Sequence, residues 1–145
     1  MRYLGIDYGS KKVGLALSDE GGKLAFPKVV LKNDEYLLSA IKEIRHEEKV
    51  DEIVMGESLT LSGEPNEIMK EIKEFKVKLE EELNLPVHLE KEFLTTVEAR
   101  RRQGYSGQAR RRPARVKIIP TKKRKEPVDA IAAALILQRH LDKLQ

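Results

Sequence analysis

The sequence predicts an α/β fold in which a mixed five-stranded sheet carries helices on both faces. Short apolar runs separated by glycine turns fill the first 31 residues, a pattern typical of consecutive antiparallel strands. Beyond residue 34, amphipathic helical patterns alternate with short continuous apolar runs, which favours helical crossovers between parallel strands. With 145 residues and 40% hydrophobic content, the chain is expected to form a single domain over residues 1–145.

The first half of the chain predicts four strands and one helix. Three strands are expected at Tyr3–Asp7, Val13–Ser18 and Leu24–Leu31, with turns at Gly9 and at Gly21 and Gly22. Their short links predict an antiparallel meander. A helix is expected over Asp34–Glu48, and the apolar run Ile53–Gly56 suits a buried parallel strand.

The second half predicts two more crossovers. A long amphipathic helix is expected over Glu67–Glu82, ended by Asn84 and Pro86, and a fifth strand over Val87–Glu92. The capping box at Thr95–Glu98 predicts a further helix, and Pro127 precedes the apolar run Val128–Leu137 of the last one. This order matches the ribonuclease H-like fold, an analogy of topology. Actin-like and sugar-kinase ATPases open similarly but close two such domains on a nucleotide, and this chain holds one.

Composition narrows the function classes. The chain has no cysteine, which excludes disulfides and thiolate metal sites, and its three scattered histidines do not favour zinc. No stretch has the length of a membrane span or the pattern of a signal region, so we expect a cytoplasmic protein without a membrane partner.

Positive charge is concentrated in one segment. The formal net charge is only +4. From residue 100 to 125 no acidic residue occurs, and the basic residues include Arg110, Arg111, Arg112, Lys122, Lys123, Arg124 and Lys125. We expect this segment, together with Lys11 and Lys12, to bind a nucleic-acid backbone. The alternative is a solvated loop of charges.

Three carboxylates are candidates for catalysis. Asp7 ends the first strand beside the Gly9 turn, Glu92 ends the last strand, and Asp129 lies in the first turn of the final helix. The predicted topology makes the C-terminal ends of the first and fifth strands near neighbours. Carboxylates that converge there repel one another unless cations intervene, so we expect Mg²⁺ or Mn²⁺, as a pair of ions clamping a phosphodiester. Alternatively, Glu92 is a surface residue and Asp129 a helix-end acid. Asp19 is expected to brace the turn after the second strand.

Four segments in order resemble the YqgF/RuvX family. These are the opening Gly5–Asp19, then Ile53–Gly56 with Ser62 and Gly63, then Glu92–Ala99, and finally Lys122–Lys125 with Val128–Leu137. Members are described as pre-16S rRNA nucleases and as Holliday-junction-resolvase-like proteins. The resemblance implies 5'-end processing of pre-16S rRNA in ribosome biogenesis, with junction cleavage in DNA recombination and repair as the alternative.

Some positions depart from the family pattern. Lys91 and Phe93 replace an acid and an arginine around Glu92, and Ser58 stands where a loop proline would be. Two hypotheses therefore stand: a nuclease that uses Asp7, Glu92 and Asp129, which the intact carboxylates favour, and a nucleic-acid-binding protein with weakened catalysis. Strand alternation predicts that Lys91 and Phe93 face away from the site. Structured RNA is the favoured substrate and branched DNA the other, and the protein is a monomer or a homodimer.

Overall fold

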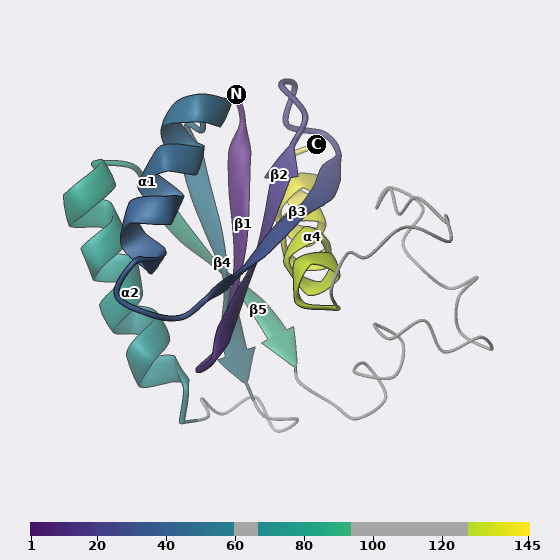
Figure 1. The fold of residues 1–145 in the computed structure, drawn as a ribbon. Coiled ribbons are helices and arrows are strands. Elements are labelled where there is room, and N and C mark those ends of the chain that lie inside the picture. Colours follow the sequence, from purple (N-terminus) through teal and green to yellow (C-terminus); the bar gives the residue numbers. More distant parts are fainter. Residues whose placement is uncertain (60–66, 94–127) are drawn as a thin grey trace, which may run out of the picture.

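The computed structural model describes residues 1–59, 67–93 and 128–145 (Figure 1). The five strands are β1 Tyr3–Tyr8, β2 Lys12–Ser18, β3 Ala25–Lys32, β4 Glu52–Leu59 and β5 Val87–Phe93. The described helices are α1 Leu37–Glu48, α2 Met69–Leu83 and α4 Val128–Lys143. The predicted helix beginning at Thr95 lies outside the described residues.

The sheet has the order β3-β2-β1-β4-β5. β1 pairs antiparallel with β2 and parallel with β4, β2 pairs antiparallel with β3, and β4 pairs parallel with β5. The predicted mixed sheet is thus confirmed. β1 and β5 end near each other at the same end of the sheet, as predicted, with β4 between them separating their backbones by about 9–10 Å.

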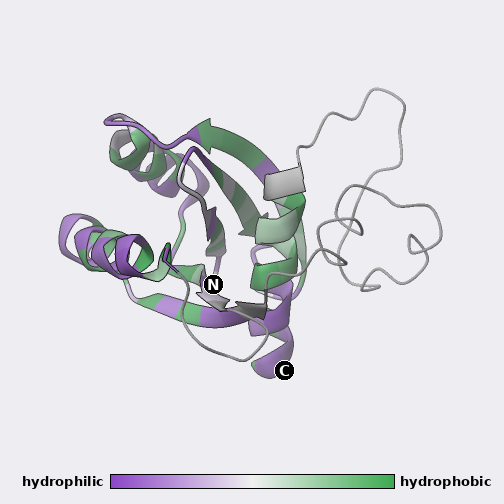
Figure 2. Ribbon diagram, turned by 90° about the horizontal axis from the view of Figure 1, so that it is seen from below, coloured by the Kyte–Doolittle hydropathy of each residue, from purple (hydrophilic) through white to green (hydrophobic). Residues whose placement is uncertain are grey.

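Helices cover both faces of the sheet, as predicted, so that the described part has three layers (Figure 2). On one face, α1 and α2 contribute Leu37, Ile41, Ile72 and Leu79 to a core with alternate residues of the strands, such as Leu4 and Ile6. On the other face, the helix that packs among the described residues is α4, through small and branched residues such as Ala133 and Leu137. The narrow alanine surface lets α4 lie close to the strands. Within the described part of the chain, no helix is both apolar enough and long enough to cross a bilayer.

Element boundaries differ from the prediction at two places. α1 begins at Leu37, because the Asp34 carboxylate accepts a hydrogen bond from the backbone N–H of Tyr36 and holds a turn there. β4 continues past Gly56 to Leu59, so Ser58 is a strand residue paired with Glu92 and not part of a loop. Asn84, with a φ of 56°, ends α2 as predicted.

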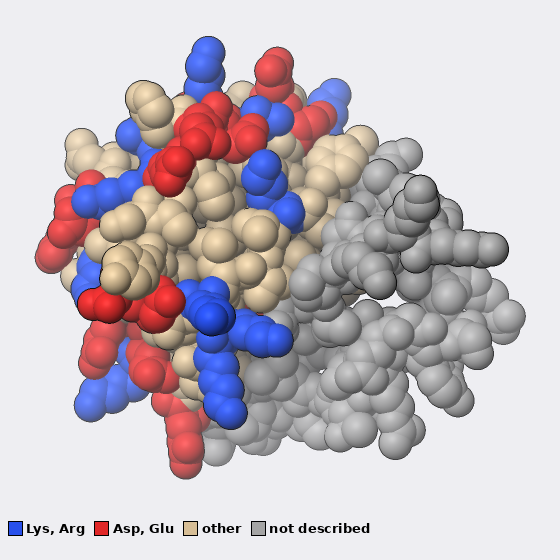
Figure 3. Space-filling model, in the orientation of Figure 1, with Lys and Arg blue, Asp and Glu red and all other residues tan. Residues whose placement is uncertain are grey.

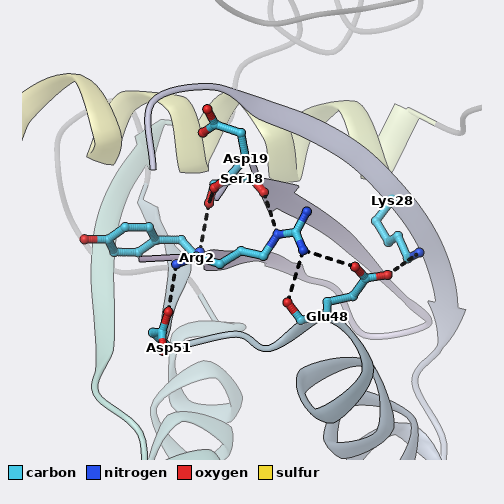
Figure 4. Close-up of polar contacts among 7 residues, drawn as sticks. Arg2, Ser18, Asp19, Lys28, Glu48 and Asp51 are labelled. Atoms are coloured by element: carbon cyan, nitrogen blue, oxygen red, sulfur yellow. Dashed lines mark hydrogen bonds and ion pairs between the residues drawn. The ribbon is translucent and has the colours of Figure 1, made fainter. Parts of the chain in front are cut away.

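Polar contacts link neighbouring chain segments at the end of the sheet where β1 begins (Figure 4). The Arg2 guanidinium donates to the carbonyl oxygens of Ser18 and Glu48, and Lys28 forms an ion pair with Glu48. The Asp19 carboxylate accepts hydrogen bonds from the backbone N–H groups of Lys23 and Leu24, which confirms its predicted bracing role. Burial opposes ionisation of Asp19, but these backbone donors outweigh it and lower its pKa.

Candidate active site

Asp7 lies on the face of the sheet that α4 covers. Its strand neighbours Leu4 and Ile6 belong to the core under α1 and α2, whereas Gly5 faces α4. Alternation therefore places Asp7 on the α4 side. Across the sheet Asp7 pairs with Gly14 of β2, and the register of Ile6 with Met55 sets Gly56 of β4 on its other side. Asp7 is thus flanked by two residues without side chains, so no side chain at these two positions stands beside the half-buried Asp7 carboxylate.

The first turn of α4 lies level with Asp7. The Tyr3 ring packs on His140 with centroids 6.0 Å apart, and Gly5 lies against Ala133 and Leu137, so α4 runs antiparallel to β1. A two-residue step along a strand covers about 6.6 Å, the length of roughly four helical residues. The same step from Gly5 to Asp7 reaches the first turn of α4, where Asp129 stands.

Glu92 occupies the α4-facing series of positions on β5. His88 and Glu90 both contact α4, and Glu92 is the next position in that series. Glu92 pairs with Ser58, one row beyond the row of Asp7. Two strand spacings and one two-residue step separate the Cα atoms of Asp7 and Glu92 by roughly 12 Å. The side chains of Glu92 and Asp129 lie outside the described set, and the side chains within it form no group of three His, Asp or Glu suited to a metal ion.

Sequence reasoning missed the contacts that fix α4 beside β5. The Glu90 carboxylate, 3% exposed, lies 2.7 Å from the Lys143 ammonium and 3.6 Å from Nδ1 of His140. The rings of His88 and His140 stack with centroids 5.0 Å apart.

Lys91 is exposed and lies on the other face of the sheet from Asp7, as predicted, because it is one position along the strand from Glu90, which faces α4. No local sequence signal pairs residues 50 positions apart, although the strand glycines at 14 and 56 were a usable signal for a low surface beside Asp7.

The basic residues predicted to bind nucleic acid divide into two groups. Lys11 and Lys12 are exposed at the turn between β1 and β2, next to Asp7 in the chain. The predicted contacts at Arg110, Arg111, Arg112, Lys122, Lys123, Arg124 and Lys125 lie outside the described residues. Figure 3 shows Lys and Arg side chains grouped near the end of the sheet where β1 and β3 end and β2 begins, which is the end where Asp7 lies.

A hollow of about 550 Å³ opens at the other end of the sheet, where β1 begins. It is lined by residues that include Arg2, Ser18, Phe26 and Glu48. The whole length of β1 separates it from Asp7. It therefore takes no part in the candidate active site.

Comparison with known proteins identifies the family. A family model described as RuvX, Holliday junction resolvase, matches residues 1–143. The chain belongs to the RuvX family. A relative from Maridesulfovibrio salexigens is 34% identical over 97% of this chain and 98% of its own length. One from Lactobacillus helveticus is 36% identical over 98% of this chain and 96% of its own. Both carry the name "Putative pre-16S rRNA nuclease".

Solved structures confirm the ribonuclease H-like fold. RuvC of T. thermophilus, solved with a Holliday junction substrate, has a TM-score of 0.60 at 18% identity, covering 99% of this chain and 96% of its own. The fowlpox virus resolvase, in complex with substrate Holliday junction DNA, has a TM-score of 0.59 at 10% identity, with 99% of each chain covered. The RuvX family, these relatives and this fold together support a hydrolytic nuclease.

Proposed function

We propose that this RuvX protein is a metal-dependent nuclease that hydrolyses phosphodiester bonds in structured nucleic acid, with Asp7, Glu92 and Asp129 as catalytic and metal-binding residues. The observation that carries the proposal is the position of Asp7. It lies between two glycines on the α4 side of the sheet, at the level of the first turn of α4 and one row from Glu92. Three elements, β1, β5 and α4, which come from the start, the middle and the end of the chain, thus carry the three carboxylates at the same end of the sheet.

The donor set suits a hard divalent cation. Carboxylate oxygens are the ligands that Mg²⁺ and Mn²⁺ prefer, and separate strands and a helix supply them. The separation of roughly 12 Å between the Cα atoms of Asp7 and Glu92 suits a pair of ions better than one ion shared directly. Bound ions would activate a water molecule and neutralise the charge of the scissile phosphate.

The residues of the chain supply the rest of the reaction. Gly14 and Gly56 leave room for a sugar-phosphate backbone to reach the Asp7 carboxylate. Lys11 and Lys12 hold the flanking phosphates by charge, with the basic segment as a further contact. The Glu90 carboxylate pairs with Lys143 and so holds the C-terminal end of α4 against β5.

The proposed substrate is pre-16S rRNA. The names of relatives that match almost end to end support this assignment. The second candidate is branched DNA, which the description of the family model favours. Resolution of a four-way junction cuts two of its strands and requires two active sites, so this second function requires a homodimer.

The test is Asp7→Asn, which removes one negative charge and keeps the shape of the side chain. Labelled pre-16S rRNA fragment and four-way DNA junction are incubated side by side with saturating Mn²⁺, and Mn²⁺ binding is followed by electron paramagnetic resonance. We expect cleavage to fall by at least about 100-fold and Mn²⁺ affinity to drop. Asp34→Asn, at the start of α1 on an exposed turn, is the matched control.

The result that contradicts the assignment is cleavage by Asp7→Asn at the parent rate. Binding of both substrates by the parent chain without cleavage of either would favour the nucleic-acid-binding alternative. Preference for one substrate in the parent chain decides between RNA and DNA.

A further inference from the structure

Two lysines stand directly opposite each other beside the candidate active site. Lys12 of β2 pairs with Lys32 of β3 in the antiparallel register, and both side chains are exposed. They lie on the same face as Asp7, because Gly14, the partner of Asp7, pairs with Val30, and Lys12 and Lys32 form the next pair on that face. Among the described residues, neither lysine has an ion-pair partner.

A β-bulge creates this opposition. The register shifts between Leu15 and Ala16, where Val29 and Pro27 are the respective partners, so Lys28 is an extra residue in β3. If the register of Ala16 with Pro27 continued without this shift, Leu31 would stand opposite Lys12, and Lys32 would lie one position further along β3. The bulge places the positive charge of Lys32 opposite that of Lys12. This pair does not stabilise the fold, since like charges opposite each other destabilise a strand pair.

The turn that carries Lys11 and Lys12 is held rigidly to the end of β3. Asn33 donates from its side-chain amide to the carbonyl of Gly9 at 2.8 Å, and its backbone N–H donates to the carbonyl of Lys11 at 2.9 Å. A Cβ at Gly9 would lie only 2.6 Å from the carbonyl oxygen of Lys12, so the turn leaves no room for a side chain at this position. The positions of the lysine Cα atoms are therefore fixed relative to Asp7.

We propose that Lys32, with Lys11 and Lys12, forms a preorganised phosphate clamp that holds the nucleic-acid backbone on the α4 side of the sheet beside Asp7. The proposal rests on the proposed function and adds Lys32 to it as a positioning residue. A polyanion is the partner that fits, because bound phosphates neutralise the repulsion between the paired ammonium groups. An acidic protein surface is the competing partner chemistry, and it would not produce the salt dependence that counterion release from nucleic acid gives.

The test compares Lys32→Ala with Lys78→Ala, an exposed lysine on α2 that removes the same charge on the far side of the sheet. Fluorescence anisotropy with a labelled RNA hairpin and a labelled four-way DNA junction gives affinity as a function of salt. For Lys32→Ala we expect several-fold weaker binding and a loss of about 0.7–0.9 from the slope of log affinity against log salt. Lys78→Ala should keep the parent slope, and Lys32→Arg should restore it.

A second readout is stability. Lys32→Ala should have a urea midpoint equal to or higher than the parent, because it removes a like-charge pair, so weaker binding cannot come from unfolding. Equal salt slopes for Lys32→Ala and Lys78→Ala would overturn the clamp while leaving cleavage by the parent chain, and thus the proposed function, intact. A parent chain that binds neither probe would overturn both.

Discussion

Gly5→Ala tests whether the close contact between β1 and α4 sets the geometry of the candidate active site. A Cβ at Gly5 would lie 2.8 Å from Cβ of Leu137 and 2.9 Å from the carbonyl oxygen of Ala133. Ordinary contact between such atoms needs about 3.5–4.0 Å, so α4 must move outward by about 1 Å. Both clashing atoms belong to the backbone or to the base of a side chain, and a rotamer change cannot relieve the clash.

The magnitude follows from two opposing effects. Overpacking of this kind costs about 1–3 kcal/mol, and the lower chain entropy of alanine returns about 0.5–1 kcal/mol. Taking the middle of each range, we expect Gly5→Ala to lower the free energy of unfolding by about 1 kcal/mol. The shift also carries the first turn of α4, with Asp129, away from Asp7. Misplacement of a catalytic group by about 1 Å lowers the rate by as much as about 100-fold.

The assay combines urea unfolding, followed by circular dichroism, with cleavage of the preferred substrate at a temperature where every variant is folded. Gly21→Ala is the matched control, because its Cβ would meet nothing closer than the Asp19 carboxylate at 3.7 Å. That variant should unfold within about 0.5 kcal/mol of the parent and cleave normally. A Gly5→Ala protein with the parent's unfolding midpoint and cleavage rate would refute the close contact between β1 and α4.

Two further predictions concern pH. Burial, with the nearby His88 charge, lowers the pKa of His140 below 6.5. The unfolded chain therefore binds a proton at a higher pH than the folded chain does. Stability should fall as pH drops below 6.5, and it should stop falling once pH is below the pKa of His140 in the folded chain. His140→Gln should flatten the fall in thermal midpoint between pH 7.5 and 5, and an unchanged fall would contradict this assignment. Asp19→Ala should lose about 1 kcal/mol at pH 7, because it removes the charged acceptor of the hydrogen bonds from the backbone N–H groups of Lys23 and Leu24. The same hydrogen bonds lower the pKa of Asp19, so their contribution to stability is present above pH 3.8 and is lost as pH falls. The gap from the parent should close as pH falls below 3.8, and a gap that persists in acid would show that the charge is not responsible.

Local patterns in the sequence were enough to predict the order of the described elements. Alternation and short glycine turns define β1, β2 and β3, and helical spacing defines α1, α2 and α4, because these periodicities come from backbone geometry within a few residues. The predicted end of β4 was wrong because local patterns do not report pairing between distant strands. The stretch from Glu57 to Leu59 has no strong strand pattern of its own and is extended because it pairs with β5.

The sequence by itself therefore determined the types of element, the glycine turn after Asp7 and the residues able to bind a cation. Only the tertiary structure decided which of them share a face. It placed β4 between β1 and β5, ran α4 antiparallel over Gly5, and set Lys32 opposite Lys12 through one extra residue in β3. The physical reason is that register and helix docking depend on contacts between residues far apart in the chain, and a shift of one residue changes the face on which a side chain lies.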